Sequence, residues 1–279
     1  MVKIRKIITS IKSKTLKLIY TSSPKTYNKI ISSITYVKIG LLIGSRIQRQ
    51  KKRKIIFYNN LFRNISNTVV YDLGSSIGNM TEVFLLSGAK KVICFEPQIE
   101  SYKVAKSRFL FNDRVKLNNY AISNKNQKLK FHIHSTNPGI STLSEKWKNI
   151  NNANNKKEYR ETIVKTKTID WSIKRNLLPN YIKIDIEGYE LKVLEKLKTP
   201  IGLISFEANM PYFNNETIKI INKLDNLAQG NCIFKIVDFK RKVNSPWMKT
   251  KKLKKLLNSK HIQNSKEIFF KNSNLRFLE

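Results

Sequence analysis

Five acidic side chains stand where short apolar segments of the chain end. They are Asp72, Glu96, Asp185, Glu187 and Glu207. Carboxylates accept hydrogen bonds from ribose hydroxyls, and a carboxylate whose pKa is raised by burial can take a proton from an alcohol. Because the carboxyl ends of parallel strands meet at one edge of a sheet, we expect these groups to gather there. Their chemistry is that of a nucleoside site beside an activated hydroxyl.

A glycine-containing turn follows the first of these acids. Residues 68–71 form a β-branched run typical of a buried strand, and residues 80–86 have the composition of a helix. A strand, a glycine turn and a helix together bring a ligand against backbone N–H groups. Gly74 allows the sharp turn, Gly78 leaves space that a Cβ would take from the ligand, and Asp72 faces the crevice. Alone, the same pattern also suits a plain turn between strand and helix.

A second acid lies at the spacing that nucleoside-binding folds use. Residues 91–95 form another apolar segment, and Glu96 follows it, 24 residues after Asp72. An acid about 20 residues beyond a glycine turn commonly accepts hydrogen bonds from a ribose. Pro97 has no N–H to continue a sheet, so the strand ends there and Glu96 stays at its edge. The two acids therefore predict a bound nucleoside.

The segment 181–188 alternates isoleucines with ionisable side chains. This alternation places Lys183, Asp185 and Glu187 on one face of a predicted strand. Two interpretations stay open: a Lys183–Asp185 ion pair without chemistry, or carboxylates that face a reacting hydroxyl. An alcohol needs a base to become a good nucleophile, and Asp185 is our first candidate, with Glu187 second. Glu207, which ends the next predicted strand, would orient the substrate.

Three segments taken together resemble the FkbM family of methyltransferases. The resemblance rests on Asp72-x-Gly74-x-Ser76-x-Gly78-x-x-Thr81, on Phe95-Glu96-Pro97 and on the run from Ile182 to Glu190, and it covers roughly Val69 to Asp238. Membership implies a class I methyltransferase with an α/β, Rossmann-like sheet and helices on both faces. It also implies S-adenosylmethionine as the methyl donor and, usually, O-methylation of a sugar or another hydroxyl compound.

The resemblance also assigns residues to the cofactor. The positions that match the family's motifs are Asp72, Gly74, Ser76, Gly78, Thr81 and Glu96. Backbone at Ala121, beyond the third predicted strand, would lie against the adenine. The chain departs from the family at Ser76, where the family usually has Asn; a serine can still hydrogen-bond, but its side chain reaches less far.

The chain is strongly basic, with a formal net charge of +35, and most of this charge lies outside the central region. Residues 1–71 contain 16 Lys and Arg and no acid, whereas residues 239–279 contain 12 basic and 2 acidic residues. We therefore predict a basic, mostly helical N-terminal extension (1–66), a cofactor-binding domain (67–239) and a basic C-terminal tail (240–279). Two accounts of the charge stay open: a coding bias towards Lys and Asn, or attraction to an anionic phospholipid, nucleotide-linked sugar or nucleic acid.

Isoleucines near the N-terminus recur at helical spacing, with basic residues between them: Ile4, Ile7, Ile8 and Ile11. Such a helix can pack on the core or lie in an anionic membrane interface, so peripheral membrane contact through residues 1–54 is one partner hypothesis. No apolar run reaches the ~20 residues that a spanning helix needs. None has the length of a signal-peptide core either, and we expect a cytoplasmic protein.

Two histidines raise the question of a metal site. His132 and His134 share one face of a strand predicted over residues 129–134. No third ligand accompanies them at a persuasive spacing, so we predict an exposed strand face and no metal.

Three functions remain for the whole chain. The first is methyl transfer to a hydroxyl of a sugar, glycan or similar small molecule. The second is methylation of an RNA ribose 2′-hydroxyl, which the basic flanks motivate, although nucleic acid is the less expected partner. Methylation of base carbons needs a nucleophilic cysteine, often after a proline, and neither Cys94 nor Cys232 is so placed. The third is a non-catalytic scaffold that docks on anionic surfaces, which the departure at Ser76 motivates.

Overall fold

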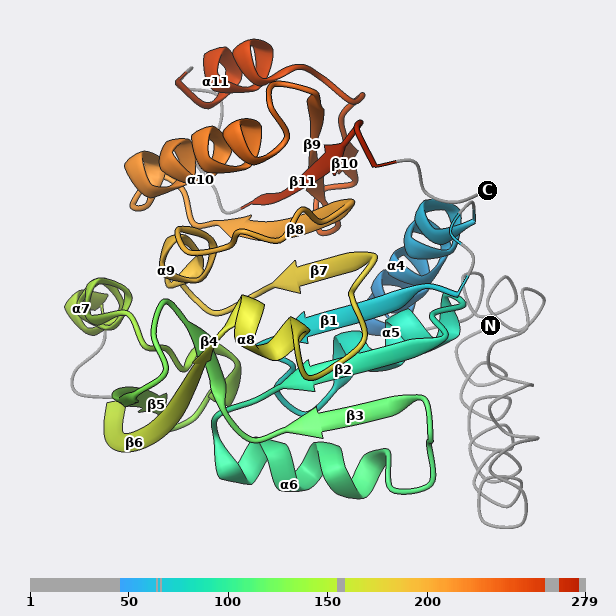
Figure 1. The fold of residues 1–279 in the computed structure, drawn as a ribbon. Coiled ribbons are helices and arrows are strands. Elements are labelled where there is room, and N and C mark those ends of the chain that lie inside the picture. Colours follow the sequence, from blue (N-terminus) through green and yellow to red (C-terminus); the bar gives the residue numbers. More distant parts are fainter. Residues whose placement is uncertain (1–45, 64, 66, 155–158, 259–265, 276–279) are drawn as a thin grey trace, which may run out of the picture.

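In the described part of the chain, the main β-sheet has eight strands, which run through the centre of the molecule (Figure 1). The computed structural model describes residues 46–63, 65, 67–154, 159–258 and 266–275. The strands lie in the order β10-β9-β11-β8-β7-β1-β2-β3. Their bounds are β1 (Val69–Leu73), β2 (Lys91–Phe95), β3 (Val115–Asn118), β7 (Tyr181–Ile184), β8 (Leu203–Ala208), β9 (Cys232–Asp238), β10 (Val243–Asn244) and β11 (Lys266–Asn272).

Neighbouring strands from β8 to β3 in this order are parallel. Asp72 of β1 pairs in register with Cys94 of β2 and with Lys183 of β7. Glu96 follows Cys94 by two residues, and Asp185 follows Lys183 by two residues. Both acids therefore leave the sheet at the same edge as Asp72. The predicted gathering of acids at one carboxyl edge is confirmed for these strands.

Strand β11 enters the sheet from the opposite direction. It is antiparallel to β8 and to β9, and Glu267 lies opposite Glu207 on one side and Val237 on the other. Since Glu207 is near the carboxyl end of β8, the start of β11 lies at the same edge. An acid from the C-terminal part of the chain is thereby added to this edge.

Helices cover both faces of the sheet (Figure 1). On one face, α4 (Arg46–Phe62) and α5 (Asn79–Leu86) pack through Tyr58 and Phe84 against Tyr181 of β7. α6 (Ile99–Arg108) is followed by Phe109, which belongs to the same cluster. The other face is covered by α8 (Ile169–Ile173), α9 (Glu190–Leu194), α10 (Asn214–Leu227) and α11 (Thr250–Asn258). The predicted α/β, Rossmann-like fold is confirmed.

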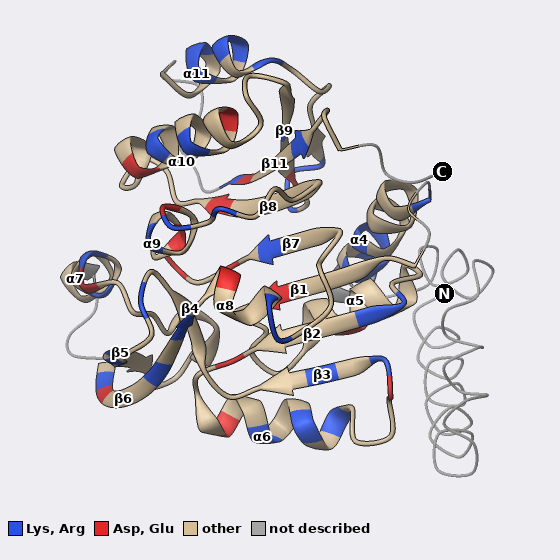
Figure 2. Cartoon of the chain, in the orientation of Figure 1, with Lys and Arg blue, Asp and Glu red and all other residues tan. Residues whose placement is uncertain are grey.

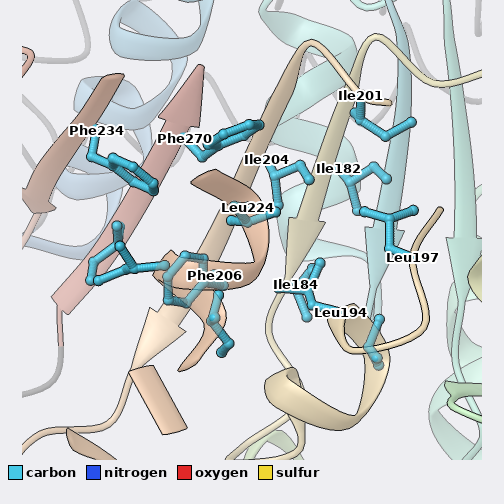
Figure 3. Close-up of a cluster of buried hydrophobic side chains, with 14 of the residues drawn as sticks. Ile182, Ile184, Leu194, Leu197, Ile201, Ile204, Phe206, Leu224, Phe234 and Phe270 are labelled. Carbon is cyan, nitrogen blue, oxygen red and sulfur yellow. The ribbon is translucent and has the colours of Figure 1, made fainter. Parts of the chain in front are cut away.

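Side-chain alternation within β7 separates the two cores. Ile182 and Ile184 pack with Leu194 of α9 on one face (Figure 3), whereas Tyr181 belongs to the cluster beneath α4. A parallel strand covered on both faces is normally apolar throughout. Lys183 is the exception, because it is buried with a residue exposure of 4% and must find polar partners inside the protein.

A smaller sheet stands beside the main one and carries the order β4-β6-β5, with β4 (Ala121–Ser123), β5 (Lys128–His134) and β6 (Tyr159–Thr168). The short helix η1 (Pro138–Ile140) and α7 (Glu145–Asn154) lie between β5 and β6 in the chain. The predicted strand over residues 129–134 is confirmed. The predicted exposed face is wrong, because His132 and His134 are both buried. Glu145, at the start of α7, lies 2.9 Å from His132 Nε2 and accounts for part of this burial.

The structure differs from the predicted division into extension, domain and tail. β11 lies between β8 and β9, so residues 240–279 contain a strand of the main sheet and not only a tail. α4 falls within residues 1–66, yet its Tyr58 is fully buried in the core. The charge of these segments marks their solvent-facing side chains, whereas burial of apolar ones such as Phe269 and Phe270 decides where the backbone packs.

Among the described residues, no helix is long and apolar enough to cross a membrane. The helix predicted around Ile4 to Ile11 lies outside the residues that the structure describes.

Candidate functional site

A narrow cleft opens at the carboxyl edge of the parallel strands, and we call it the first cleft. Its lining includes Gly74, Ser76, Glu96, Ala121 and Asp185, all of which are site candidates from the sequence. Pro97, Ile122, Phe131, Ile186 and Leu143 add apolar surface to its walls. A concave, largely apolar cleft with a few converging polar groups is typical of a small-molecule site.

Glu96 is the most strongly held polar group of the first cleft. Its two carboxylate oxygens accept hydrogen bonds from the backbone N–H of Ser76 (2.7 Å) and of Gln98 (2.8 Å). Burial raises the pKa of Glu96 to about 7, against the opposing effect of these two hydrogen bonds. Each oxygen of a carboxylate has a second lone pair, so Glu96 can still accept hydrogen bonds from a ligand.

Gly74 is required by two separate features of the turn. Its φ is +78°, and an added Cβ would lie 2.0 Å from the carbonyl oxygen of Asp185. Gly78 also has a positive φ, of +83°, but the atom that a Cβ would meet there belongs to the ring of Phe109, at 2.3 Å. The expectation that Gly78 makes space for the ligand is therefore corrected: in the structure it makes space for a packed aromatic ring.

Asp72 and Thr81 lie beneath the first cleft and not in its lining. Thr81 Oγ1 donates a hydrogen bond of 2.7 Å to Asp72, and both side chains are buried. Burial raises the pKa of Asp72 to about 6, although the hydrogen bond from Thr81 acts in the other direction. The structure thus differs from the expectation that Asp72 faces the crevice. This pair joins the end of β1 to the first turn of α5 and so supports the glycine turn.

A second, wider cleft of about 480 Å³ lies on the α4 side of the same edge. We call it the basic cleft, because Lys54, Lys183, Lys240, Arg241 and Lys266 are in its lining. The lining also contains Asp185, Glu207, Asp238 and Glu267. In Figure 2, a basic position near the tip of β7 stands between acidic positions on the neighbouring strands β1 and β8. Asp185 lines both clefts, so it stands where a ligand of one would meet a ligand of the other.

Three carboxylates meet close to this junction. Asp185, Glu187 and Glu207 each bring one oxygen into a group whose members all lie within 4.8 Å of one another. All three side chains are partly exposed. The structure therefore brings together the three catalytic candidates that the sequence predicts.

Glu187 reaches this group by a different route from the predicted one. β7 ends at Ile184, and Glu187 has a left-handed backbone with a φ of +55°, so it belongs to a turn and not to an alternating strand. Glu190 holds the turn, since its Oε1 accepts hydrogen bonds from the backbone N–H of Ile186 (3.3 Å) and of Gly188 (3.2 Å). The hydroxyl of Thr142 adds a bond of 2.7 Å to the carbonyl of Glu187.

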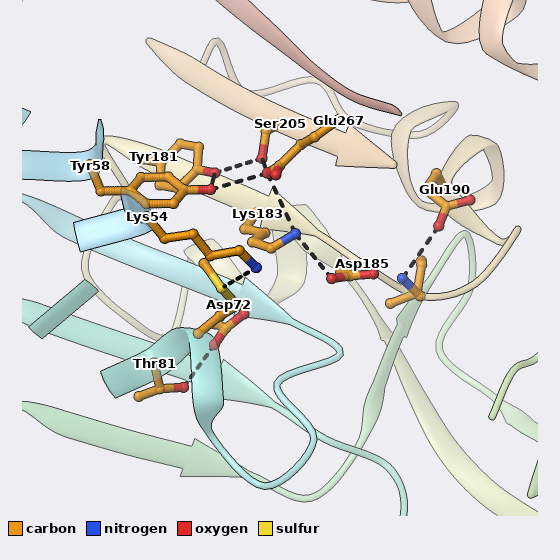
Figure 4. Close-up of polar contacts among 12 residues, drawn as sticks. Lys54, Tyr58, Asp72, Thr81, Tyr181, Lys183, Asp185, Glu190, Ser205 and Glu267 are labelled. Carbon is orange, nitrogen blue, oxygen red and sulfur yellow. Dashed lines mark hydrogen bonds and ion pairs between the residues drawn. The ribbon is translucent and has the colours of Figure 1, made fainter. Parts of the chain in front are cut away.

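Lys183 supplies the positive charge next to the carboxylates. Its Nζ lies 3.0 Å from Asp185 Oδ2 and 3.5 Å from Glu267 Oε1 (Figure 4). Burial acts to lower the pKa of Lys183, but the charges of Asp185 and Glu267 outweigh it and hold this pKa well above its usual value. The predicted Lys183–Asp185 ion pair is present, and it does not remove Asp185 from the clefts.

Glu267 connects this ion pair to a network of buried hydroxyls. It accepts hydrogen bonds from Tyr58 (3.1 Å) and Ser205 (2.7 Å), and Ser205 also lies 2.6 Å from the hydroxyl of Tyr181 (Figure 4). Glu267 and Tyr58 are not among the site residues predicted from the sequence, because they lie in the predicted tail and extension. The apolar run Ile268 to Phe270 directly after Glu267 is the signal of a strand that would have placed this acid at a sheet edge.

The carboxylates of the junction have different pKa values for physical reasons. Burial acts to raise the pKa of Asp185, but the charge and hydrogen bond of Lys183 outweigh it, so this pKa is lowered. Burial and, after it, the charge of Asp185 raise the pKa of Glu207 to about 8. Burial, followed by the charges of Glu207 and Asp185, raises the pKa of Glu187 well above its usual value. At neutral pH Asp185 is therefore ionised, while Glu207 is mostly protonated.

Two groups in the described residues have carboxylate or imidazole atoms close enough for a divalent cation. One is the junction of Asp185, Glu187 and Glu207, and the other is His132 with Glu145 and Glu161. In the second group Lys148 lies 2.6 Å from Glu145, so a cation would compete with an ammonium already in place. The junction offers three oxygen ligands, the type that Mg²⁺ prefers, but there too an ammonium is already in place, because Lys183 Nζ lies 3.0 Å from Asp185.

Comparison with known proteins gives one family. The family described as Methyltransferase FkbM domain matches residues 72–231. No curated protein matches the chain.

Solved structures with a similar fold come from several organisms. A proposed RNA methyltransferase from Pyrococcus horikoshii is 13% identical, with 81% of this chain and 85% of that chain covered and a TM-score of 0.41. An rRNA methylase from Streptococcus thermophilus is 12% identical, with 78% of this chain and 94% of that chain covered and a TM-score of 0.40. A SAM-dependent O-methyltransferase from Thermotoga maritima is 14% identical, with 80% and 66% covered and a TM-score of 0.40.

Proposed function

Because the chain belongs to the FkbM methyltransferase family and is thus an S-adenosylmethionine-dependent methyltransferase, we propose that it methylates a hydroxyl of a sugar, glycan or similar small molecule. The observation that carries this proposal is the position of Asp185. This one carboxylate lines both the first cleft and the basic cleft. Methyl transfer needs donor and acceptor to meet in line at a distance of ~3 Å, and a wall shared by two clefts is where they would meet.

We place the cofactor in the first cleft. We assign Glu96 to the ribose hydroxyls, because its carboxylate is fixed by two backbone N–H groups and keeps free lone pairs. Backbone at Ala121 and the apolar side chain of Ile122 would lie against the adenine, and the turn from Gly74 to Ser76 against the rest of the molecule. Gly78, Asp72 and Thr81 would support this turn from below. When bound, S-adenosylmethionine supplies a methyl carbon on a sulfonium whose thioether leaves readily.

The acceptor hydroxyl would lie against the carboxylates at the junction of the clefts. Asp185 is ionised beside Lys183, so it can accept a hydrogen bond from the hydroxyl. Its pKa is lowered, not raised, so it is a weak base and takes the proton only as the new C–O bond makes the hydroxyl strongly acidic. Glu207 keeps its proton at neutral pH, so it can donate a hydrogen bond that orients the acceptor. Burial, followed by the charges of Glu207 and Asp185, favours the protonated form of Glu187, so it would offer the acceptor a second hydrogen-bond donor.

The first prediction tests the role of Asp185. Asp185→Asn keeps the size of the side chain but cannot take a proton, so we expect kcat for labelled methyl transfer to fall by about 10²–10⁴-fold. Binding of S-adenosylhomocysteine, measured by calorimetry, should change by no more than a few fold. The matched control is Asp113→Asn, which removes an exposed carboxylate that lines neither cleft. An unchanged kcat of Asp185→Asn, measured with a hydroxyl compound as acceptor, would contradict the assignment of Asp185 as the base.

A second candidate function is methylation of an RNA ribose 2′-hydroxyl. The observation that favours it is the basic composition, with a net charge of +35 and several lysines in the basic cleft. RNA binding of this kind weakens steeply with salt. Incubation with labelled cofactor and either total RNA or a panel of sugars and glycans separates the two candidates. The family assignment argues against the third alternative, a non-catalytic scaffold.

We also keep peripheral contact between residues 1–54 and an anionic membrane as a proposal. Its support is the basic, isoleucine-containing sequence of that segment. Flotation of the protein with vesicles of neutral or anionic phospholipid tests it, and equal flotation with both vesicle types would contradict it.

A further inference from the structure

The basic cleft has more cations than its own carboxylates neutralise. Lys183 is paired with Asp185 and Glu267, and Lys266 lies 2.6 Å from Asp238. In the described part of the chain, the three remaining cations of the lining, Lys54, Lys240 and Arg241, have no carboxylate within ion-pair distance. Of the four acids in the lining, only Glu207 is outside these pairs.

Lys54 is held inside the cleft by neutral neighbours. Its Nζ lies 3.5 Å from the sulfur of Met80 and 5.4 Å from the centre of the Phe239 ring (Figure 4 shows its position beside Lys183). Burial, and after it the charge of Lys183, lowers the pKa of Lys54. An ammonium in such surroundings has lost part of its hydration, and the charges of Glu267 and Asp185 offset this only in part, so a bound anion would compensate it further.

Lys240 and Arg241 stand on a turn that is fixed independently of their side chains. The backbone N–H groups of both residues donate to Asp238 Oδ1, at 2.9 and 3.0 Å. Asp238 also binds Lys266, which anchors the turn to β11. The backbone of the turn is therefore fixed, while the side chains of Lys240 and Arg241 remain available to a ligand. A turn that is already ordered reduces the conformational entropy that is lost on binding.

We propose that the methyl acceptor carries a phosphate group, as a sugar phosphate or a nucleoside-diphosphate sugar does, and that Lys54, Lys240 and Arg241 bind this group. The inference rests on the proposed function, because it names the chemical class of the acceptor. Asp185 and the three cations line the same cleft, so a phosphate held by the cations leaves the sugar hydroxyls towards the carboxylates. Arginine and lysine are the side chains that bind phosphate in proteins, and their bonds to it are charge-assisted.

A cleft favours a small phosphate compound over a polynucleotide. The three cations converge on one cavity that also holds the junction carboxylates, whereas RNA binding relies on cations spread along a surface that follows the backbone. A neutral glycan would leave the cations without a partner.

Binding of inorganic pyrophosphate to the full chain is the direct test. By calorimetry at fixed salt, we expect the double variant Lys240→Gln/Arg241→Gln to bind pyrophosphate about 10–100-fold more weakly than the wild type. The matched control is Lys251→Gln/Lys255→Gln, which removes the same charge from exposed positions on α11 and should change the affinity less than twofold. Both variants should bind S-adenosylhomocysteine as the wild type does, which shows that they fold. Equal pyrophosphate affinity in the two double variants would overturn the proposal.

Ligands of graded structure identify the source of the phosphate. Glucose 1-phosphate and UDP are compared with pyrophosphate, and tighter binding of UDP, lost in Lys240→Gln/Arg241→Gln, points to a nucleoside-diphosphate sugar. Tighter binding of glucose 1-phosphate with the same dependence points to a sugar phosphate. With acceptors that are methylated, the double variant should raise KM for the phosphorylated form at least tenfold and change kcat little.

The outcomes separate this inference from the proposed function. Methylation of neutral sugars with no effect of the double variant overturns the phosphate inference and leaves O-methylation standing. Pyrophosphate binding with the expected dependence, but no methyl transfer to any hydroxyl compound, overturns O-methylation and keeps the anion site. Labelling of RNA, lost in the double variant while small phosphates neither bind nor compete, would overturn the choice of a small acceptor.

Discussion

The two clefts that meet at Asp185 are built in different ways. The first cleft takes most of its lining from one stretch of chain, residues 74–143, which begins with the neighbouring strands β1, β2 and β3 in succession. The basic cleft instead collects Lys54 from α4, Glu207 from β8 and Glu267 from β11. A locally encoded site tolerates change elsewhere in the chain, whereas a site assembled from distant segments depends on the whole packing. We infer that cofactor binding and acceptor binding respond separately to mutation, except at Asp185, which lines both clefts.

Gly74→Ala should have the largest effect, because it damages both clefts at once. An alanine here has a left-handed backbone and a Cβ 2.0 Å from the carbonyl of Asp185. We expect the free energy of unfolding to fall by about 3 kcal/mol or more and S-adenosylhomocysteine binding to be lost. Denaturant unfolding and calorimetry measure the two effects.

Gly230→Ala is the matched control for this change. Gly230 has almost the same φ, +75°, but no atom lies within 4 Å of an added Cβ. The backbone cost alone is about 1–2 kcal/mol. Equal losses in the two variants would show that the contact between Gly74 and Asp185 does not matter.

Glu96→Gln should affect the first cleft alone. The amide keeps the shape of the side chain but loses the charge and one acceptor, while the N–H groups of Ser76 and Gln98 still need partners. We expect S-adenosylhomocysteine to bind about 10–100-fold more weakly. Pyrophosphate binding should stay within twofold of the wild type. A loss of affinity for both ligands would mean that the clefts are not independent.

The pH dependence of methyl transfer should report the protonated Glu207. Its pKa in the folded protein is about 8, above its usual value of 4.5. As pH rises through 8 the carboxyl loses the proton with which it orients the acceptor, so kcat/KM should fall above this pH. Glu207→Gln always keeps a donor, and its profile should lack this descending limb. A limb that persists in the variant would assign it to another group.

The raised pKa of Glu207 also makes the free energy of unfolding depend on pH. In the unfolded chain Glu207 ionises near pH 4.5, while in the folded protein it stays protonated until about pH 8. The folded state therefore binds more protons between these values, and the contribution of Glu207 to stability is lost as pH rises from about 4.5 to 8. Glu207→Gln should flatten this part of the curve of unfolding free energy against pH.

Ser76→Asn should have the smallest effect and a favourable one. Ser76 has a φ of +49°, a left-handed conformation that Asn adopts more easily than Ser. We expect a gain of about 0.5 kcal/mol in the free energy of unfolding and somewhat tighter S-adenosylhomocysteine binding. Ser76→Ala, which keeps the strain and loses the hydroxyl, is the comparison. A destabilised Ser76→Asn would show that the hydroxyl of Ser76, and not its backbone, matters.

Several lining residues of the first cleft can be predicted from the order of residues along the chain. Strand, turn and spacing predict Gly74 and Glu96, because parallel strands that follow one another place their carboxyl ends side by side, whereas Ala121 follows from the resemblance to the family. The sequence also placed Asp185, Glu187 and Glu207 near one another, since each follows or ends a strand of the same sheet.

How these residues affect one another depends on the packing of the folded chain. The charge of Lys183 keeps Asp185 ionised, while burial keeps Glu207 protonated, and neither effect can be read from spacing. The tertiary structure also decided that Glu267, more than 80 residues after Asp185, belongs to the same edge, because β11 inserts between β8 and β9. Periodicity records which face of an element is apolar, but the pairing of distant elements depends on how all their apolar faces are buried together.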